Sequence, residues 1–441
     1  MSASKRRVSI TSKLVLVATT YVLPIGVLLY LFVGSINEFI NFAEAERKGD
    51  AYQRPLEGLL DGVERHQILV HGGATPAEVQ AVSAKVDRAF TALEGEDERL
   101  GVDLQFTEEG LQKRDRSQCK VKIVKEQWQA ITAELAKVKD ARKLPEDLDT
   151  RYGKLVTDIR TMITHCGDTS NLILDPDLDS YYLMDVTLLG LPQVQERTAR
   201  VVLYGREVLA RGVATREEQM QLVVHAAMLE SDLDRITASV QTSLNEDANF
   251  YGDSPTLKEK LPPAVAAYKE ALTRFIQMTR QVSDPSAPKV TEAEYVAAGL
   301  KAHDESFQLW TVGVGELDVL LDKRIDHYTT RRTRSLTLAS LAVLVASVLA
   351  LLVTLSIIRP LTALVRRLGP GATLLASSVN RIAEASQRGT ATSEEAAIIC
   401  EELNAHADEM RMSVGELESL VHGHPVTQLE PAPKQEVLAH A

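Results

Sequence analysis

The segment from 171 to 185, NLILDPDLDSYYLMD, combines four aspartates with two adjacent tyrosines. Tyr181, Tyr182 and Asp185 lie at its end, where two phenol groups and a carboxylate could contact a small molecule held between helices. This pattern is compatible with binding chemistry and with an ordinary helix start. We therefore take these three residues as ligand-binding candidates.

The aspartates just before these tyrosines have a structural interpretation as well. Asp175 precedes Pro176, which predicts a helix cap with proline at the first helical position. Asp177 and Asp179 would then face the positive end of the helix dipole. The D-x-D-x-D spacing also suggests a calcium loop, but the glycine and the final glutamate of the EF-hand pattern are missing. The cap is the favoured interpretation.

A second candidate binding site contains a histidine. The histidines do not form a recognisable metal site. Arg65 and His66 stand side by side near the end of the first external helix, and we include both among the ligand-binding candidates. A lone histidine is more often a surface or core residue than a ligand. His165 and Cys166 are neighbours that would not converge on one metal from a helix. No nucleophile, base or metal cluster is recognisable, so we predict no enzyme activity, no metal and no cofactor.

The chain has three cysteines, which are too few for a disulfide scaffold. Cys119 and Cys166 would lie about level if their helices form a hairpin that turns near 143–145. A disulfide between them is therefore possible in an oxidising compartment, and two buried thiols are the alternative. Cys400 is expected in the reducing cytoplasm.

Two uncharged stretches, 14–36 and 335–358, are each long enough to cross hydrocarbon as a helix, which takes about 20 apolar residues. A cleaved signal peptide would have a shorter apolar core and a small-residue cleavage site. The flanking basic residues predict that both termini are cytoplasmic, with 1–13 as the N-terminal segment and 37–334 outside. We therefore predict a multi-pass protein of the bacterial inner membrane. The supporting residues are Lys5, Arg6, Arg7, Lys13, Arg359, Arg366 and Arg367, whereas Arg331, Arg332 and Arg334 argue the other way.

The external segment has the pattern of an all-α domain. Apolar residues recur at intervals of three and four, and no segment alternates like a strand. About eight helices are predicted, arranged as two stacked four-helix bundles, and the last continues from Thr291 into the second apolar stretch. Four T-x-x-E capping boxes mark helix starts, at Thr75, Thr215, Thr256 and Thr291. The net charge of −12 excludes a general basic surface for nucleic acid.

The segment after the second stretch carries family resemblances. Residues 359–371, which begin RPLTALVRRL, resemble the first helix of a HAMP linker, and Gly369-Pro370-Gly371 predicts a break there. Residues 372–423 are predicted as one coiled-coil helix, and 424–441 as a disordered tail. Within the predicted coiled-coil helix, the stretch from Ser386 to Gly423 resembles the end of the signalling domain of methyl-accepting chemotaxis proteins. The matching residues are Gln387, Glu394, Glu395, Glu401, Glu402, Leu403, Asn404, Ala405, Met410, Val414, Glu416, Leu417, Leu420, Val421 and Gly423.

The resemblance implies a transmembrane chemoreceptor. In that family, glutamates flanked by small residues are methylated, so Glu395 is the implied methyl acceptor, with Glu394 behind it; a solvated acidic stripe is the alternative. The hairpin tip that holds the histidine kinase and its adaptor is absent. The resemblance therefore does not imply that this chain binds the kinase or the adaptor. The implied protein is a homodimer, or a mixed dimer with other chemoreceptors. It senses a small molecule or a periplasmic binding protein, or else it senses nothing and modulates full-length receptors.

Overall fold

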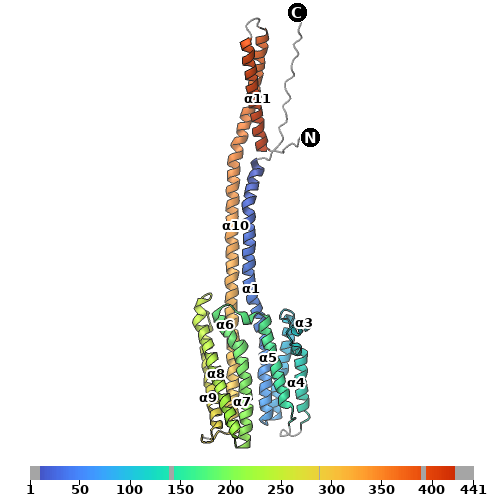
Figure 1. Ribbon diagram of the computed structural model, residues 1–441, viewed down its shortest axis with the longest axis vertical. Coiled ribbons are helices and arrows are strands. Elements are labelled where there is room, and N and C mark those ends of the chain that lie inside the picture. Colours follow the sequence, from blue (N-terminus) through green and yellow to red (C-terminus); the bar gives the residue numbers. More distant parts are fainter. Residues whose placement is uncertain (1–9, 139–143, 288, 389–393, 423–441) are drawn as a thin grey trace. The chain divides into compact units, whose positions relative to one another are not determined.

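The computed structural model describes residues 10–138, 144–287, 289–388 and 394–422, without the side chains of 385–388, 394–399 and 416–422 among others. The described chain is all-helical (Figure 1). It divides into two compact units. The bundle unit is Ser35–Arg331, and the second unit combines Met1–Gly34 with Arg332–Ala441. The expected all-α class is confirmed, and each unit is described by itself below.

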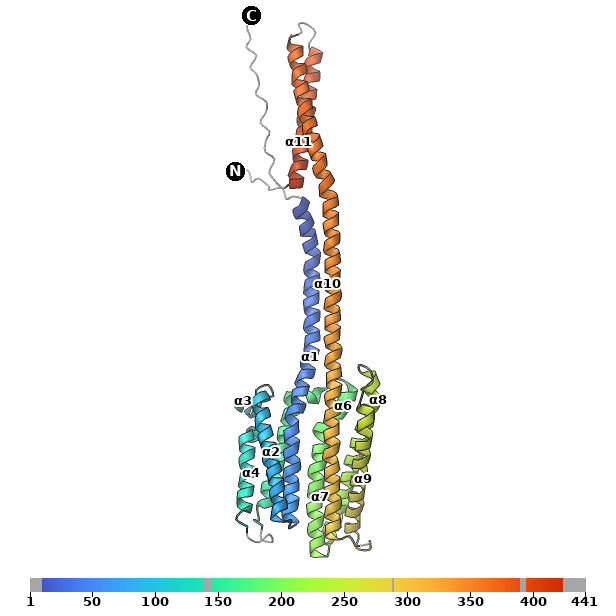
Figure 2. The same ribbon diagram turned by 180° about the vertical axis from the view of Figure 1, so that it is seen from behind.

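The bundle unit consists of two four-helix groups that lie side by side rather than stacked as predicted (Figures 1 and 2). The first group contains the part of α1 after Ser35, together with α2, α4 and α5, and the second contains α7, α8, α9 and the part of α10 before Arg332. The long helices are α1 (Ile10–His71), α2 (Pro76–Leu100), α4 (Val121–Leu135), α5 (Leu148–Thr169), α7 (Leu191–Arg211), α8 (Arg216–Glu246), α9 (Leu257–Ser283) and α10 (Glu292–Arg388). The short elements are α3 (Glu108–Gln112), η1 (Ser117–Cys119), η2 (Leu172–Leu174), α6 (Leu178–Met184), η3 (Asp185–Gly190) and η4 (Asp247–Asn249).

Three of the four predicted capping boxes are confirmed. At α2, α8 and α10 the threonine hydroxyl accepts from the backbone N–H three residues later, and the glutamate side chain accepts from the threonine N–H. At α9 the prediction was wrong. The Thr256 hydroxyl donates instead to Glu316 of α10 at 2.6 Å. A partner 60 residues away therefore replaces the local one.

The predicted cap before the tyrosines is displaced by two residues. Helix α6 begins at Leu178, with Asp177 as its N-cap, so Pro176 lies outside the helix. The Asp175 carboxylate accepts hydrogen bonds from the backbone N–H of Asp177 and from the Ser180 hydroxyl, both at 3.0 Å. This turn around Asp175 brings its carboxylate into the interior, where it has a second role described below.

One apolar core extends through both groups, with aromatic rings buried in each. Phe90, Trp128 and Tyr152 are fully buried in the first group, and Phe275 and Tyr295 in the second. Close helix contact in the second group depends on Gly205 of α7. A Cβ atom there would lie 2.5 Å from Cε1 of Tyr295, which is too close for any side chain.

The second unit contains the end of α10 and α11 (Glu394–His422), which runs back along it (Figures 1 and 2). The predicted break at Gly369-Pro370-Gly371 was wrong, because α10 continues through Pro370 to Arg388. Val365, Ala372 and Val379 are buried at seven-residue intervals on both sides of that proline, so packing outweighs its local preference. The predicted single coil of 372–423 is therefore two antiparallel helices. The predicted tail, 424–441, lies outside the described residues.

Within the described chain, α1 and α10 each contain a stretch long and apolar enough to cross a membrane. Almost none of either stretch is buried inside the protein. Apolar side chains that remain this exposed along a whole helix are expected to contact lipid or another apolar surface.

Candidate functional site

Helix α1 has a second buried face, and this one is polar. Its side chains follow the three- and four-residue spacing of one helix face, and each is at most 8% exposed. This face is directed at the second helix group, since the Gln53 amide donates to the Thr187 carbonyl at 2.8 Å. We call the face and its partners the polar seam. Its α1 members are Glu46, Asp50, Gln53, Glu57, Asp61 and Glu64.

One end of the seam is closed by a buried arginine. Arg324 of α10, 3% exposed, donates to Glu46 at 2.7 Å, to Asp175 at 2.5 Å and to the Ser180 hydroxyl at 2.6 Å. Its Nε lies 2.6 Å from the Asp177 carboxylate. One cation therefore joins α1, α10 and the turn that precedes α6. Asp175 and Asp177, which the sequence indicated as part of a helix cap, are therefore also ion-pair partners of Arg324.

Electrostatics at this end favour one protonated carboxyl. Burial, together with the neighbouring Asp175, raises the pKa of Glu46 to about 9, against the opposing effect of Arg324. Burial also raises the pKa of Asp175, although Arg324 partly offsets it. At neutral pH Glu46 therefore carries a proton, and the guanidinium is not outnumbered by three full negative charges.

The other end of the seam is closed by a buried histidine. His303 of α10 is fully buried, and its Nε2 lies 2.9 Å from the Glu64 carboxyl. Its Nδ1 lies 3.8 Å from Asp61, which also pairs with Lys85 of α2. Burial lowers the pKa of His303 to about 4, so the ring is neutral at pH 7. The contact with Glu64 is then a hydrogen bond rather than an ion pair.

Between these two ends, the seam contains carboxyl groups without a partner. Neither oxygen of Asp50 or of Glu57 makes a hydrogen bond among the described residues, and both side chains are at most 2% exposed. Gln195 of α7 is near enough to lower the pKa of Glu57, yet its amide makes no hydrogen bond. Burial dominates and raises both carboxyl pKa values well above normal. Burial therefore favours the protonated, neutral form of both groups.

A π-helical turn supplies the acceptor in the middle of the seam. Segment η3 (Asp185–Gly190) is π-helical, and such turns leave backbone groups free for other partners. The Thr187 carbonyl accepts from Gln53 of α1 and also from the Trp310 indole of α10, at 2.8 and 2.9 Å. This carbonyl therefore holds both long helices at once.

The ligand-binding candidates from the sequence fall into two separate surroundings. Tyr181 and Tyr182 contact each other edge to face, with ring centroids 5.4 Å apart, and Asp185 accepts from Arg235 of α8 at 2.5 Å. Arg65 pairs with Asp304 of α10, while His66 is buried beside Tyr152 and Ser83. No contact joins the two sets among the described residues. Their role in ligand binding stays a prediction.

The modification and disulfide candidates have different outcomes. Glu394 and Glu395 lie at the start of α11, but their side chains lie outside the described residues. Cys119 and Cys166 are free, buried thiols that donate to different carbonyl groups, those of Asp158 and Gly49. The structure therefore matches the alternative of two thiols rather than a disulfide.

Sequence reasoning missed the seam, although one signal was present. The six polar residues from Glu46 to Glu64 repeat with the period of a helix, as do the leucines of the apolar face beside them. Two interleaved periods, one polar and one apolar, indicate a helix that is buried on two sides. Arg324 has no comparable signal, because it lies in the charged run DKRID.

No protein-family model and no curated protein matches this chain. A solved structure titled "Structure of the NasR transcription antiterminator" is similar over 92% of this chain and 98% of that chain, with a TM-score of 0.44 and 14% identity. A likeness at this level carries no argument about function. The chemoreceptor resemblance thus rests on residues of the α11 region and stays a prediction.

Proposed function

We propose that the chain is a chemoreceptor-like transmembrane signal transducer. In this proposal it is anchored in a bacterial inner membrane by α1 and α10, with the bundle unit in the periplasm and both termini in the cytoplasm. The observation that carries the proposal is the extent of α10. One helix holds His303 and Arg324 of the seam, the apolar stretch 335–358, and the segment that pairs with α11.

The seam supports a signalling role through the kind of contacts it makes. Apolar contacts tolerate small sliding movements, whereas hydrogen bonds to named partners specify one register. Because α10 has no break between the seam and the apolar stretch, a change of register would be passed along the helix rather than absorbed by a linker. A ligand would shift this equilibrium only through different affinities for the two registers.

The proposal is tested first for topology and then for transmission. Alkaline phosphatase fused after Gly252 should be active outside, and fused after Ala385 inactive. For transmission, Leu374 of α10, which is 67% exposed, is changed to cysteine in a Cys400→Ser chain. Disrupting the seam with Arg324→Met, which removes the bond to Glu46 of α1, should change the alkylation rate of this cysteine at least threefold in membranes. An internal phosphatase at Gly252, or an unchanged rate, would refute the proposal.

Methylation is a separate part of the same proposal. If Glu395 accepts a methyl group, labelled methyl from S-adenosylmethionine should enter the chain in cells with the methylating enzyme. The Glu395→Gln variant should lose most of that label, and Glu394→Gln less. Equal labelling of Glu395→Gln and the wild type would remove this part and leave the transmission test unaffected.

A second candidate function is a modulator that senses nothing and pairs with full-length receptors. The observation that favours it lies in α11, where Leu403, Met410 and Met412 are 37%, 40% and 66% exposed. Exposed apolar side chains on a two-helix pair favour further helices as partners. Oxidative crosslinking through the half-buried Cys400 separates the cases. A homodimer supports the receptor, and a conjugate with another receptor supports the modulator.

A further inference from the structure

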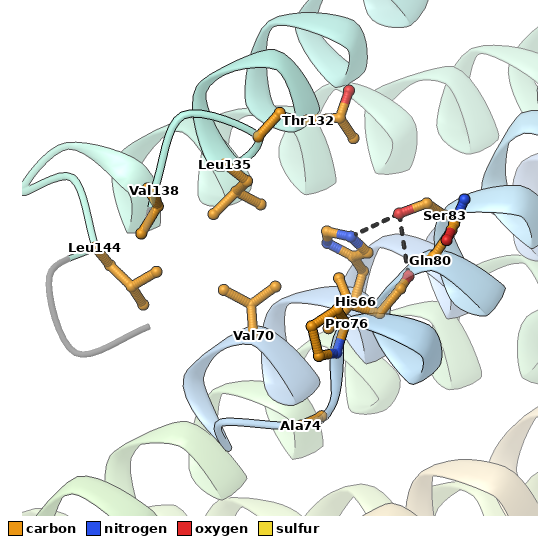
Figure 3. A pocket seen from close by; sticks show the side chains of 12 residues that line it. His66, Val70, Ala74, Pro76, Gln80, Ser83, Thr132, Leu135, Val138 and Leu144 are labelled. Carbon is orange, nitrogen blue, oxygen red and sulfur yellow. Dashed lines mark hydrogen bonds between the residues drawn. The ribbon is translucent and has the colours of Figure 1, made fainter. Parts of the chain in front are cut away.

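A cavity of about 430 Å³ lies between α1, α2 and α4 in the bundle unit (Figure 3). Its volume is within the range of small-molecule sites, about 300–1,000 Å³. Figure 3 shows side chains from these three helices around a common space, with Leu135 and Val138 opposite Val70 and His66. The lining residues are His66, Val70, Ala74, Pro76, Val79, Gln80, Ser83, Thr132, Leu135, Ala136, Val138 and Leu144.

The described lining of this cavity carries no full charge at pH 7. None of these described lining residues is an aspartate, glutamate, lysine or arginine. The one titratable lining side chain is His66, and burial lowers its pKa to about 4, so it is neutral at pH 7. Its ring nitrogens already bond to the hydroxyls of Tyr152 at 2.5 Å and Ser83 at 2.9 Å. An ion that entered would therefore meet no opposite charge among the described lining residues.

The polar side chains of the described lining are few. Gln80 and Ser83 come from α2, and Thr132 from α4, whereas most other lining residues are aliphatic or proline. A site of this kind takes its affinity from apolar contact and its orientation from one or two hydrogen bonds. The matching ligand is an aromatic or aliphatic molecule with a single hydroxyl or carbonyl group.

The cavity and the seam meet on the same turn of α1. His66 and Val70 form part of the cavity wall, and Glu64, two residues before His66, bonds to His303 of α10. A ligand that fixes the end of α1 against α2 and α4 would therefore act on the helix that carries one closing bond of the seam.

We propose that this cavity binds a small, uncharged, largely apolar organic molecule, and that its occupancy is the signal carried by the seam. The second half of this inference rests on the proposed function, whereas the first half concerns binding alone. It moves the ligand site away from Tyr181, Tyr182 and Asp185 and retains only His66 from the sequence-based candidates.

Binding is tested on the full chain in detergent with three probes that share one ring system. These are 2-naphthol, which is neutral at pH 7, 2-naphthoate, an anion, and 2-naphthylmethylamine, a cation. Isothermal titration calorimetry should show saturable binding of 2-naphthol and at least tenfold weaker binding of both ions. Equal affinity for the three probes, or no binding of 2-naphthol, would overturn the proposal.

The site itself is tested by filling it. Leu135→Trp should weaken 2-naphthol binding at least tenfold, and Val70→Phe serves as a second variant should the first fail to fold, as judged by circular dichroism. Val223→Trp is the matched control, because Val223 is 52% exposed on α8 and should leave binding unchanged. Unchanged binding in a folded, filled variant would overturn the assignment of the site.

The effect of ligand binding on the cytoplasmic segment is measured in a separate experiment. A failure of signalling can then be distinguished from a failure of binding. Saturating 2-naphthol should change the alkylation rate at Leu374→Cys at least threefold, and Leu135→Trp should remove that response. Binding without any rate change would overturn the signalling half while the site stands. An inactive phosphatase reporter at Gly252 would place that position inside the cell. This result would refute the proposed function and leave the binding result unaffected.

Discussion

Replacing Arg324 with methionine tests whether the seam holds the two helix groups together. The side chain is 3% exposed and contacts Glu46, Asp175, Asp177 and the Ser180 hydroxyl. Methionine keeps much of the volume and removes the cation. Asp175 and Asp177 then remain without a counter-charge, and breaking a buried pair in this way costs about 3–5 kcal/mol.

The control is an ion pair of similar geometry at the surface. Arg280 and Glu230 lie 2.5 Å apart, with side chains 47% and 50% exposed. Such exposed pairs contribute about 0–1 kcal/mol. Arg280→Met should therefore change the free energy of unfolding far less than Arg324→Met. The cost of Arg324→Met should also shrink at acidic pH, because Asp175, whose pKa burial raises, can then take up a proton.

The chain has two tryptophans, one in each helix group, which makes the assay specific. Trp128 belongs to α4 and Trp310 to α10. Urea unfolding of the full chain in detergent is followed by fluorescence in Trp310→Phe and Trp128→Phe backgrounds. If the seam couples the groups, Arg324→Met lowers both transitions together. A loss no larger than that of Arg280→Met, or a shift confined to Trp310, would refute the reasoning.

Three further predictions concern single side chains. Burial raises the pKa of Glu57 when the chain folds, so its contribution to stability is present below the unfolded pKa of about 4.3 and is lost as pH rises toward the folded value. Urea unfolding should therefore show Glu57→Gln gaining on the wild type above that pH, by at most about 1.4 kcal/mol per pH unit; parallel pH profiles would contradict this. Gly205→Ala would push a methyl group into the buried Tyr295 ring and should cost about 1–3 kcal/mol of unfolding free energy, where an unchanged value would show that the ring can move. Cys119 and Cys166 should both react with Ellman's reagent in urea without reductant, and a result of one thiol per chain, from Cys400, would show a disulfide.

Helix boundaries were predictable because the groups that set them are close in sequence. Thr75 and Glu78 satisfy each other within one turn, and Gly212 ends α7 in the left-handed conformation, with φ of +79°, that glycine adopts at no steric cost. Thr256 shows the limit of that reasoning. Glu316 competes for its hydroxyl, and no local pattern reveals a partner on another helix.

The repeat of polar residues along α1 signals a second face, but the sequence does not show which of its charged residues are buried, for a related reason. Between residues 46 and 64, charged side chains occur on every face of α1, so buried ones are not distinguishable by type. Glu46 is fully buried, whereas the next residue, Arg47, forms exposed ion pairs with α10. Only the partner helix decides which charges are enclosed. A helix shared by two bundles needs two buried faces, and here only one of them is apolar.

The two closing bonds of the seam explain why a change in it should be discrete. Glu64 with His303 and Glu46 with Arg324 both join α1 to α10, and they are separated by 21 residues of α10, about 32 Å at 1.5 Å per residue. A shift of α10 along α1 by even a few ångströms would break both bonds at once, since each depends on contact within 3 Å. A partly shifted α10 would leave these buried polar groups unpaired, at about 1–3 kcal/mol each. The two bonds therefore hold α1 and α10 in one register, and under the proposed function a signal would have to break both of them together.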